Sequence, residues 1–193
     1  GMNDGSYGTT VQASPSPTAS TFTLGAGLGL KFGDSGVGGY IKVNGTKCKI
    51  ATISTDAVTL ETPLGFTPTA GMSVTHDTQE NLERMVAYLR ANGCQKILML
   101  GIHYWNYGSG DTVSTQNASA LSYRTLQSAA ATAAVVPYVD LYNLMRAKIV
   151  AGTVVQNDWA VWHSALNDPH LSAGGQSEIA SHVFAAIQDQ GWA

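Results

Sequence analysis

Two short stretches of the chain combine side chains that can do chemistry. The first, "NDPHLSAGGQ" (167–176), contains His170, with an amide and a carboxylate just upstream of it and Ser172 just downstream. A histidine before a helix N-terminus can be held in one tautomer by such neighbours and can act as a general base. The segment therefore predicts a proton-transfer site at His170, against the simpler alternative of a solvated loop histidine.

The second stretch, "HYWNYGSG" (103–110), follows an apolar run and gathers aromatic and polar side chains. Four of them are suited to sugars or other flat, hydroxylated ligands and are expected to bind substrate: His103, Tyr104, Trp105 and Asn106. The alternative is that Tyr104 and Trp105 only cover the end of a sheet.

Helices and buried strands alternate around these two stretches. "DTQENLERMVAYLRANG" (77–93) has a capping-box pattern, apolar residues at helical spacing and an Asn-Gly stop. "QKILMLGI" (95–102) and "AVVPYVDL" (134–141) are the continuous apolar runs of strands covered on both faces in a parallel sheet. Further helices are expected over about 118–134 and from Ser172 onward. Because ligands collect at the carboxyl ends of such strands, both stretches are well placed for a site.

The preceding part of the chain has a different pattern. From Gly38 to Val74, short runs of alternating apolar residues surround Asn44-Gly45, a dipeptide suited to a two-residue hairpin turn. A Pro/Ser/Thr-rich segment before it predicts a connecting loop. We therefore expect three parts: residues 1–21 with the loop, a small antiparallel β-module over 22–76, and an α/β core over 77–193.

Four blocks together resemble one known family, the SGNH or GDSL-like hydrolases: Gly1-Met2-Asn3-Asp4, the unit ending in "GIHYWN", "PYVDL" and "NDPHLSAGGQSEIA". The resemblance spans about residues 1–4 and 77–189. It implies a flavodoxin-like three-layer α/β/α sandwich that hydrolyses esters. It also implies that Gly1 and Asn3 form the oxyanion hole and that His170 is the base.

The sequence departs from the family pattern beside His170. The family has an Asp-x-x-His block, but Asn167 stands three residues before His170, and the carboxylate of Asp168 is only two residues before it. With Asn167 in the orienting place, the imidazolium would lack a charged partner. We expect Asp168 to pair with His170 through a local adjustment at Pro169.

The nucleophile is the larger departure. The family places Gly-Asp-Ser upstream of Gly-x-Asn-Asp, whereas here that tripeptide is Gly33-Asp34-Ser35, in a glycine-rich turn that could produce it by coincidence. Ser35 is thus a candidate nucleophile beside a serine not yet identified. The simplest account is a core truncated at its N-terminus, with the β-module inserted. Alternatively, the leading Gly-Met is a tag scar.

Composition limits the partners. With a net charge of −3 and no basic stripe, neither nucleic acid nor a membrane surface is expected as a partner. Cys48 and Cys94 are expected to be core thiols rather than a disulfide. The predicted chemistry needs no metal and no organic cofactor. The substrate is expected to be a small-molecule or carbohydrate ester.

Two functions from different classes remain. One is an SGNH-type esterase that acts on an acyl or acetyl ester, with a carbohydrate as one possible carrier. The other is an inactive or incomplete SGNH-like domain used for carbohydrate binding or assembly, for example in a phage or cell-surface protein. The sequence of the β-module resembles domains of phage tail and adhesion proteins. The chain shows no signal peptide. Its location is not determined by the sequence, and extracellular and virion-associated locations both stay open. The bare edges of a two-stranded sheet predict a homo-oligomer.

Overall fold

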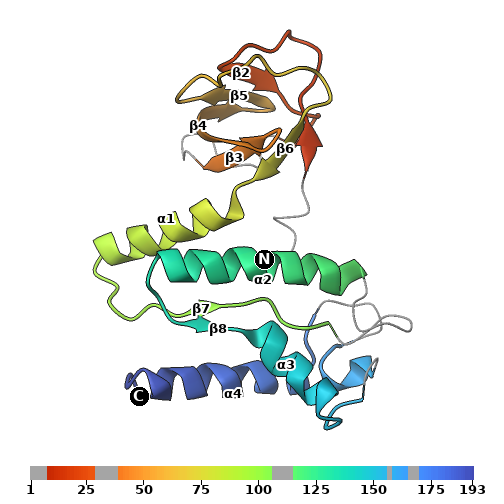
Figure 1. Cartoon of the computed structure of the whole chain (residues 1–193), viewed down its shortest axis with the longest axis vertical. Coiled ribbons are helices and arrows are strands. Elements are labelled where there is room, and N and C mark those ends of the chain that lie inside the picture. Colours follow the sequence, from red (N-terminus) through yellow and green to blue (C-terminus); the bar gives the residue numbers. More distant parts are fainter. Residues whose placement is uncertain (1–7, 29–38, 106–114, 156–157, 165–169) are drawn as a thin grey trace. The chain divides into compact units, whose positions relative to one another are not determined.

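The computed structural model describes residues 8–28, 39–105, 115–155, 158–164 and 170–193. The chain divides into two compact units, Gly1–Asn81 and Leu82–Ala193 (Figure 1). The described part of the first unit is an antiparallel β-module that ends in the first turn of a helix, and the second unit contains the other helices and a parallel strand pair. The mixed α/β class expected from the sequence is confirmed.

The β-module is one curled antiparallel sheet. Its strand order is β1-β6-β3-β4-β5-β2. The strands are β1 (Thr9–Thr10), β2 (Thr21–Thr23), β3 (Tyr40–Val43), β4 (Thr46–Ser54), β5 (Ala57–Leu60) and β6 (Ser73–His76). The backbone N–H of Gln12 donates to the carbonyl of Thr23 at 2.8 Å, so the chain just after β1 meets the end of β2 and the two edges of the sheet are joined. Joined edges leave little exposed backbone for strand addition.

The predicted hairpin at Asn44-Gly45 is confirmed. Val43 pairs with Thr46, which leaves these two residues as the loop between β3 and β4. Their φ angles are 47° and 80°, the positive values that a type I′ turn requires at both positions. Asn and Gly adopt positive φ more readily than other residues, so the turn residues fix the register of this pair.

Alternation along the strands builds the core of the module. Ile41 and Val43 are fully buried, while Lys42 between them faces outward and pairs with Asp77 at 3.4 Å. Val11 also belongs to this core, although it lies in the part expected to be a connecting loop, and so does Phe22 at the start of the expected module. The strands on either side of that segment are only two and three residues long, too short for periodicity to reveal them.

Helix α1 (Thr78–Ala91) begins and ends where the sequence predicts. Gly93 has a φ of 87°, and the N–H of Cys94 donates to the carbonyl of Leu89 at 2.9 Å, which closes the helix in a left-handed C-terminal cap. One residue of the expected apolar stripe differs: Met85 is 52% exposed. Cys94 is also exposed, contrary to expectation, while Cys48 is partly buried, and both are free thiols.

The second unit contains a parallel strand pair and three further helices among the described residues. These elements are β7 (Met99–Leu100), α2 (Thr115–Ala133), β8 (Tyr138–Val139), α3 (Leu141–Val150) and α4 (Ala173–Asp189), with a short 3-10 helix, η2, at Trp159–Val161. Met99 pairs with Tyr138 and Leu100 with Val139 in parallel register, as predicted. Figure 1 shows the pair between α2 and α4.

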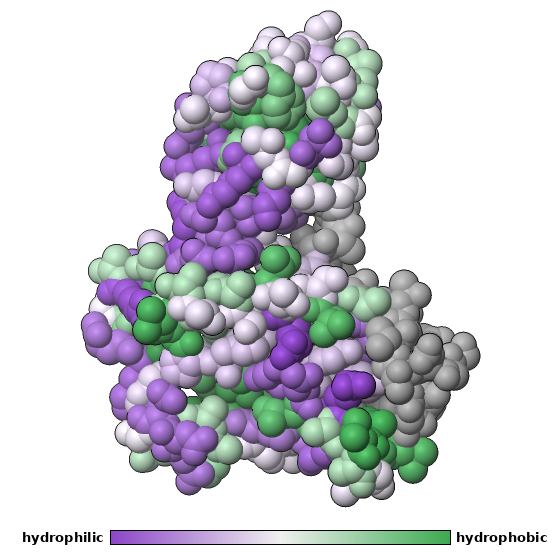
Figure 2. All heavy atoms as spheres, viewed as in Figure 1, coloured by the Kyte–Doolittle hydropathy of each residue, from purple (hydrophilic) through white to green (hydrophobic). Residues whose placement is uncertain are grey.

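Coverage of the strand pair is unequal. Met99 packs with Val86 of α1 and with Ala130 and Ala131 of α2 in one core cluster. Leu100, which points to the opposite face, is 42% exposed, so the expectation that this strand is covered on both faces is wrong at this residue. Figure 2 shows apolar patches among hydrophilic atoms on the helical unit, and the described large apolar side chains that are exposed all lie there.

Helix α3 was not predicted from the sequence. It follows β8 directly, because Asp140 both ends the strand and caps the helix by accepting from the backbone N–H of Asn143. Leu141, Tyr142 and Met145 form its buried face. The apolar pattern of the helix continues that of the strand without a break, which hid the boundary.

Candidate functional site

The segment after β7 is tied to α2 by two amide side chains. Gln127 accepts a hydrogen bond from the backbone N–H of Ile102 at 2.9 Å. Asn117, only 2% exposed, accepts from the N–H of Trp105 at 3.0 Å and donates to the carbonyl of the same residue at 2.7 Å. Asn117 thus fixes the backbone of the predicted aromatic segment. This residue was not predicted, because a lone amide in a helix gives no signal in the sequence.

Gly101 allows the chain to pack closely against β8 at the point where the aromatic segment leaves the strand pair. A Cβ on this residue would lie 2.4 Å from the hydroxyl oxygen of Tyr138 and 3.0 Å from the carbonyl oxygen of Val139. Since the second of these atoms belongs to the backbone of β8, any side chain at position 101 would separate the two strands. The glycine therefore sets where the next residues can lie.

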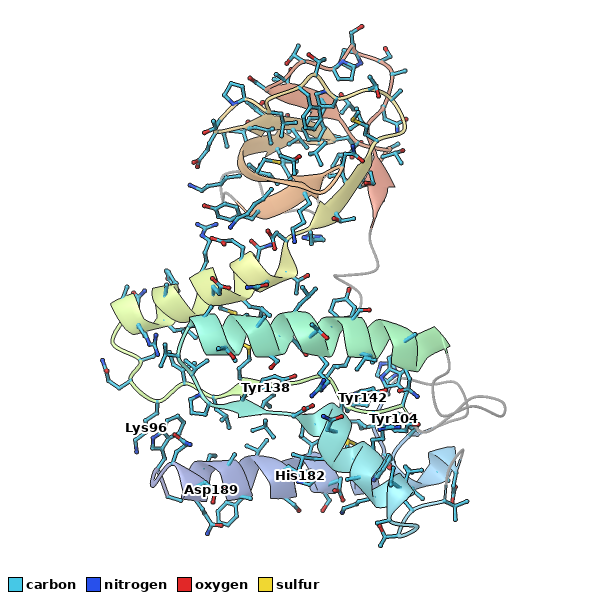
Figure 3. The ribbon with its side chains drawn as sticks, in the orientation of Figure 1. Lys96, Tyr104, Tyr138, Tyr142, His182 and Asp189 are labelled. Carbon is cyan, nitrogen blue, oxygen red and sulfur yellow. The ribbon has the colours of Figure 1, made fainter. Side chains whose placement is uncertain are left out.

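Tyr104 supports the site from inside rather than facing a ligand. It is 2% exposed, and its ring meets that of Tyr142 edge to face at 5.3 Å (Figure 3). Burial raises the pKa of the Tyr104 hydroxyl, and so does the neighbouring Tyr142. This packing favours the alternative that Tyr104 covers the sheet end.

His103 lies between two other rings. Its ring is stacked with that of Trp105 at 6.1 Å and tilted against that of His163 at 5.7 Å. Burial, together with a smaller effect of the nearby His163, lowers the pKa of His103 to about 4. The imidazole is therefore neutral at physiological pH.

His163 is a central residue that sequence analysis did not identify. It is 1% exposed and follows the equally buried Trp162. A histidine within an apolar segment gives no motif, so only its contact with His103 in the folded chain reveals it.

The segment containing His163 runs antiparallel to the chain that follows His170. His163 forms a bridge with Leu171, the N–H of Ser164 donates to the carbonyl of His170 at 3.0 Å, and the N–H of Ser172 donates to the carbonyl of Trp162 at 2.8 Å. We call residues 161–164 and 170–172 the His170 hairpin. Its two described arms are held together on both sides of the bridge.

Helix α4 begins directly after the hairpin, as predicted. Ser172 is its N-cap and accepts a hydrogen bond from the N–H of Gly175 at 3.2 Å. Gly174 and Gly175 bring the first turn of the helix against the backbone carbonyls of Val161 and Trp162. His170 stands two residues before this cap and is exposed.

An ion pair organises the end of β8. Arg124 of α2 donates one hydrogen bond from Nε, shared between the two carboxylate oxygens of Asp140, and another from Nη2 to Oδ2, at 2.6 to 2.9 Å. The same carboxylate accepts from the N–H of Asn143. Asp140 is the carboxylate at the end of β8, and these contacts indicate that it has a structural role, as an ion-pair partner and as a helix cap.

Five of the predicted site residues lie outside the described part of the chain: Gly1, Asn3, Ser35, Asn106 and Asp168. The described ones are brought together in part. His103 and Trp105 contact each other, and His163 connects them to the hairpin that carries His170.

Neither a metal centre nor a membrane span is found in what the structure describes. Within those ranges, no group of three or more His, Cys, Asp or Glu side chains is arranged to hold a metal ion. No helix there has the length and apolar character needed to cross a bilayer. Comparison of the chain with protein-family models, curated proteins and solved structures found no match.

Proposed function

We propose that this chain is an SGNH-type serine hydrolase that cleaves an acyl or acetyl ester. The observation that carries the proposal is the position of His170, two residues before the N-cap of α4, in a hairpin that contacts the segment after a parallel strand. A general base of this family belongs at such a position. We further propose that the strand pair and its helices are part of a flavodoxin-like three-layer sandwich.

In the proposed reaction, His170 removes the proton from a serine hydroxyl as the oxygen attacks the ester carbon, and later returns it to the leaving alcohol. Asp168 orients the imidazole. Asn3 and the N–H of Gly1 stabilise the oxyanion. The serine is Ser35 or one still to be identified.

The aromatic pair His103 and Trp105 supports a hydroxylated substrate such as an acetylated sugar. A stacked ring pair at the carboxyl end of a strand offers a flat apolar surface, and Trp105 is partly exposed. Since the ring of His103 is neutral, it can donate and accept hydrogen bonds without adding charge. We propose no nucleic-acid or membrane partner.

A fluorophosphonate probe tests this function, because it labels a serine only when a base activates it. We expect one labelled serine, located by peptide mapping, and loss of labelling in His170→Ala. His182→Gln is the matched control, since His182 lies further along α4 in contact with Glu178 at 2.7 Å. Equal labelling in the native chain and His170→Ala would exclude His170 as the base.

The alternative function, a domain for binding or assembly without catalysis, is favoured by one observation. The β-module has a complete apolar core of its own, with its sheet edges joined. If the probe labels no serine in folded protein, this alternative is the better proposal. We also propose a homo-oligomer formed through the strand pair, and a monomeric mass by light scattering would contradict it.

A further inference from the structure

The contact between His103 and His163 joins two segments that are far apart in the sequence. The ring centroids lie 5.7 Å apart at an interplanar angle of 44°. One ring belongs to the segment that Asn117 fixes after β7, and the other to the His170 hairpin. Among the ring contacts between described residues, it is the one that connects these two segments.

The His170 hairpin cannot move independently of this contact. His163 is bridged to Leu171, and the hydrogen bonds from Ser164 and Ser172 lie on either side of the bridge. A shift of His163 therefore moves the backbone that carries His170.

The contact requires a neutral His103. Its Nε2 atom is buried and has no hydrogen-bond partner within the described ranges. A proton added there would bury a charged donor without an acceptor, and such burial is costly. Among the described residues, His163 is the titratable group that acts electrostatically on His103, and it disfavours the charge as well.

Other described polar groups of the second unit have partners elsewhere and do not compensate for such a charge. The amides of Asn117 and Gln127 are engaged with backbone groups of the same segment. The Asp140 carboxylate is bonded to Arg124, and Tyr104 packs against Tyr142. No described carboxylate is in hydrogen-bonding contact with His103.

We propose that His103 and His163 are positioning residues for His170, and that their ring contact holds the hairpin only while His103 is neutral. Protonation of His103 then favours an open state in which the hairpin has left the strand end. This positioning role follows from the packing of the two rings and does not depend on what His170 does. The consequence for a general base at His170 rests on the proposed function.

The sign of the pH dependence follows from proton linkage. His103 binds its proton more weakly in the closed state, where its pKa is about 4, than in the open state, where the ordinary value of 6.5 applies. The open population is therefore lowest above pH 6.5, rises about tenfold for each pH unit below it, and levels off below pH 4. Across this interval of about 2.5 pH units the hairpin loses protection by about 300-fold.

Amide hydrogen exchange of the whole chain, followed by NMR, measures this opening directly. The reporters are the amides of Ser164 and Ser172, which donate across the hairpin. Their protection factors should fall as the pH is lowered from 6.5 to 4, while His103 ring signals titrate with a midpoint near 4. Constant protection over this range, or a His103 midpoint near 6.5, would overturn the proposal.

His103→Phe supplies the matched variant, because it keeps an aromatic ring but cannot take a proton. We expect the pH dependence of Ser164 and Ser172 protection to be weaker by one proton, about tenfold less per pH unit. His182→Gln should retain the native dependence. If His103→Phe fails to fold, the native titration alone decides; identical dependence in a folded variant refutes the role of His103.

Probe labelling separates this inference from the proposed function. Exchange of the two amides does not require catalysis, so a pH-dependent hairpin without serine labelling would refute the hydrolase but keep the positioning role. Labelling together with a pH-independent hairpin would do the reverse. Where both hold, the acid limit of labelling should move to lower pH in His103→Phe.

Discussion

Gly175→Ala tests whether the close packing of the backbone of Trp162 on Gly175 of α4 fixes the position of the His170 hairpin. A Cβ at this position would lie 2.2 Å from the carbonyl oxygen of Trp162 and 2.9 Å from Cδ2 of Leu171. The closest atom belongs to the backbone, so no rotamer change relieves the overlap. The segment must instead retreat by about 1 Å to reach van der Waals distance.

Three contributions set the size of the effect. Overpacking of this kind costs about 1–3 kcal/mol. The retreat also weakens the hydrogen bond that Trp162 accepts from Ser172, at about 0.5–1.5 kcal/mol. Replacing glycine by alanine within a helix contributes about 1 kcal/mol in the stabilising direction. The expected net result is destabilisation by about 1–3 kcal/mol.

Thermal unfolding followed by helical circular dichroism measures this change, since the helices lie in the second unit apart from the first turn of α1. We expect the Tm to fall by about 4 °C for each kcal/mol. Ser177→Ala, at an exposed position of the same helix, should change stability by less than about 0.5 kcal/mol. A Tm that rises for Gly175→Ala would show that helix propensity dominates and that the carbonyl of Trp162 does not pack closely against this glycine.

Two further substitutions test the supports of the site. Asn117→Ala should cost about 2–4 kcal/mol in thermal or urea unfolding, because it leaves the N–H and the carbonyl of Trp105 without their partner; an effect below about 1 kcal/mol would contradict this. Asp140→Asn keeps an N-cap for α3 but removes the charge that Arg124 contacts, so we expect a loss of about 1–2 kcal/mol that high salt reduces in the native chain. Equal stability of this variant and the native chain would show that capping alone matters.

Local patterns in the sequence predicted most of the elements. Asn44-Gly45 defines its hairpin because the backbone there needs positive φ at two successive residues, and Ser172 predicts a helix start because its hydroxyl accepts from Gly175. Such features depend on a few neighbouring residues. They can be inferred without knowing the rest of the fold.

The features that could not be predicted depend on contacts between distant segments. Val11 enters the core of the module because β1 and β2 join its sheet, and neither strand is long enough to show periodicity. Helix α3 was missed because Asp140 ends one element and begins the next within a single apolar run. His163 became visible only through its contact with His103.

The position of the His170 hairpin and the proposed orientation of the His170 ring involve different residues, which makes the two separable by mutation. The position of the His170 hairpin depends on its packing against Gly175, on the Ser172 cap and on the ring of His163. None of these residues exchanges a proton with His170 in the proposed reaction. In the proposed reaction, the orientation of the His170 ring depends on the carboxylate of Asp168. Gly175→Ala should therefore lower serine labelling at all pH values. A change at Asp168 should instead lower labelling while the Ser164 and Ser172 amides keep their protection from exchange, and loss of that protection in both variants would mean that the carboxylate acts by placing the hairpin.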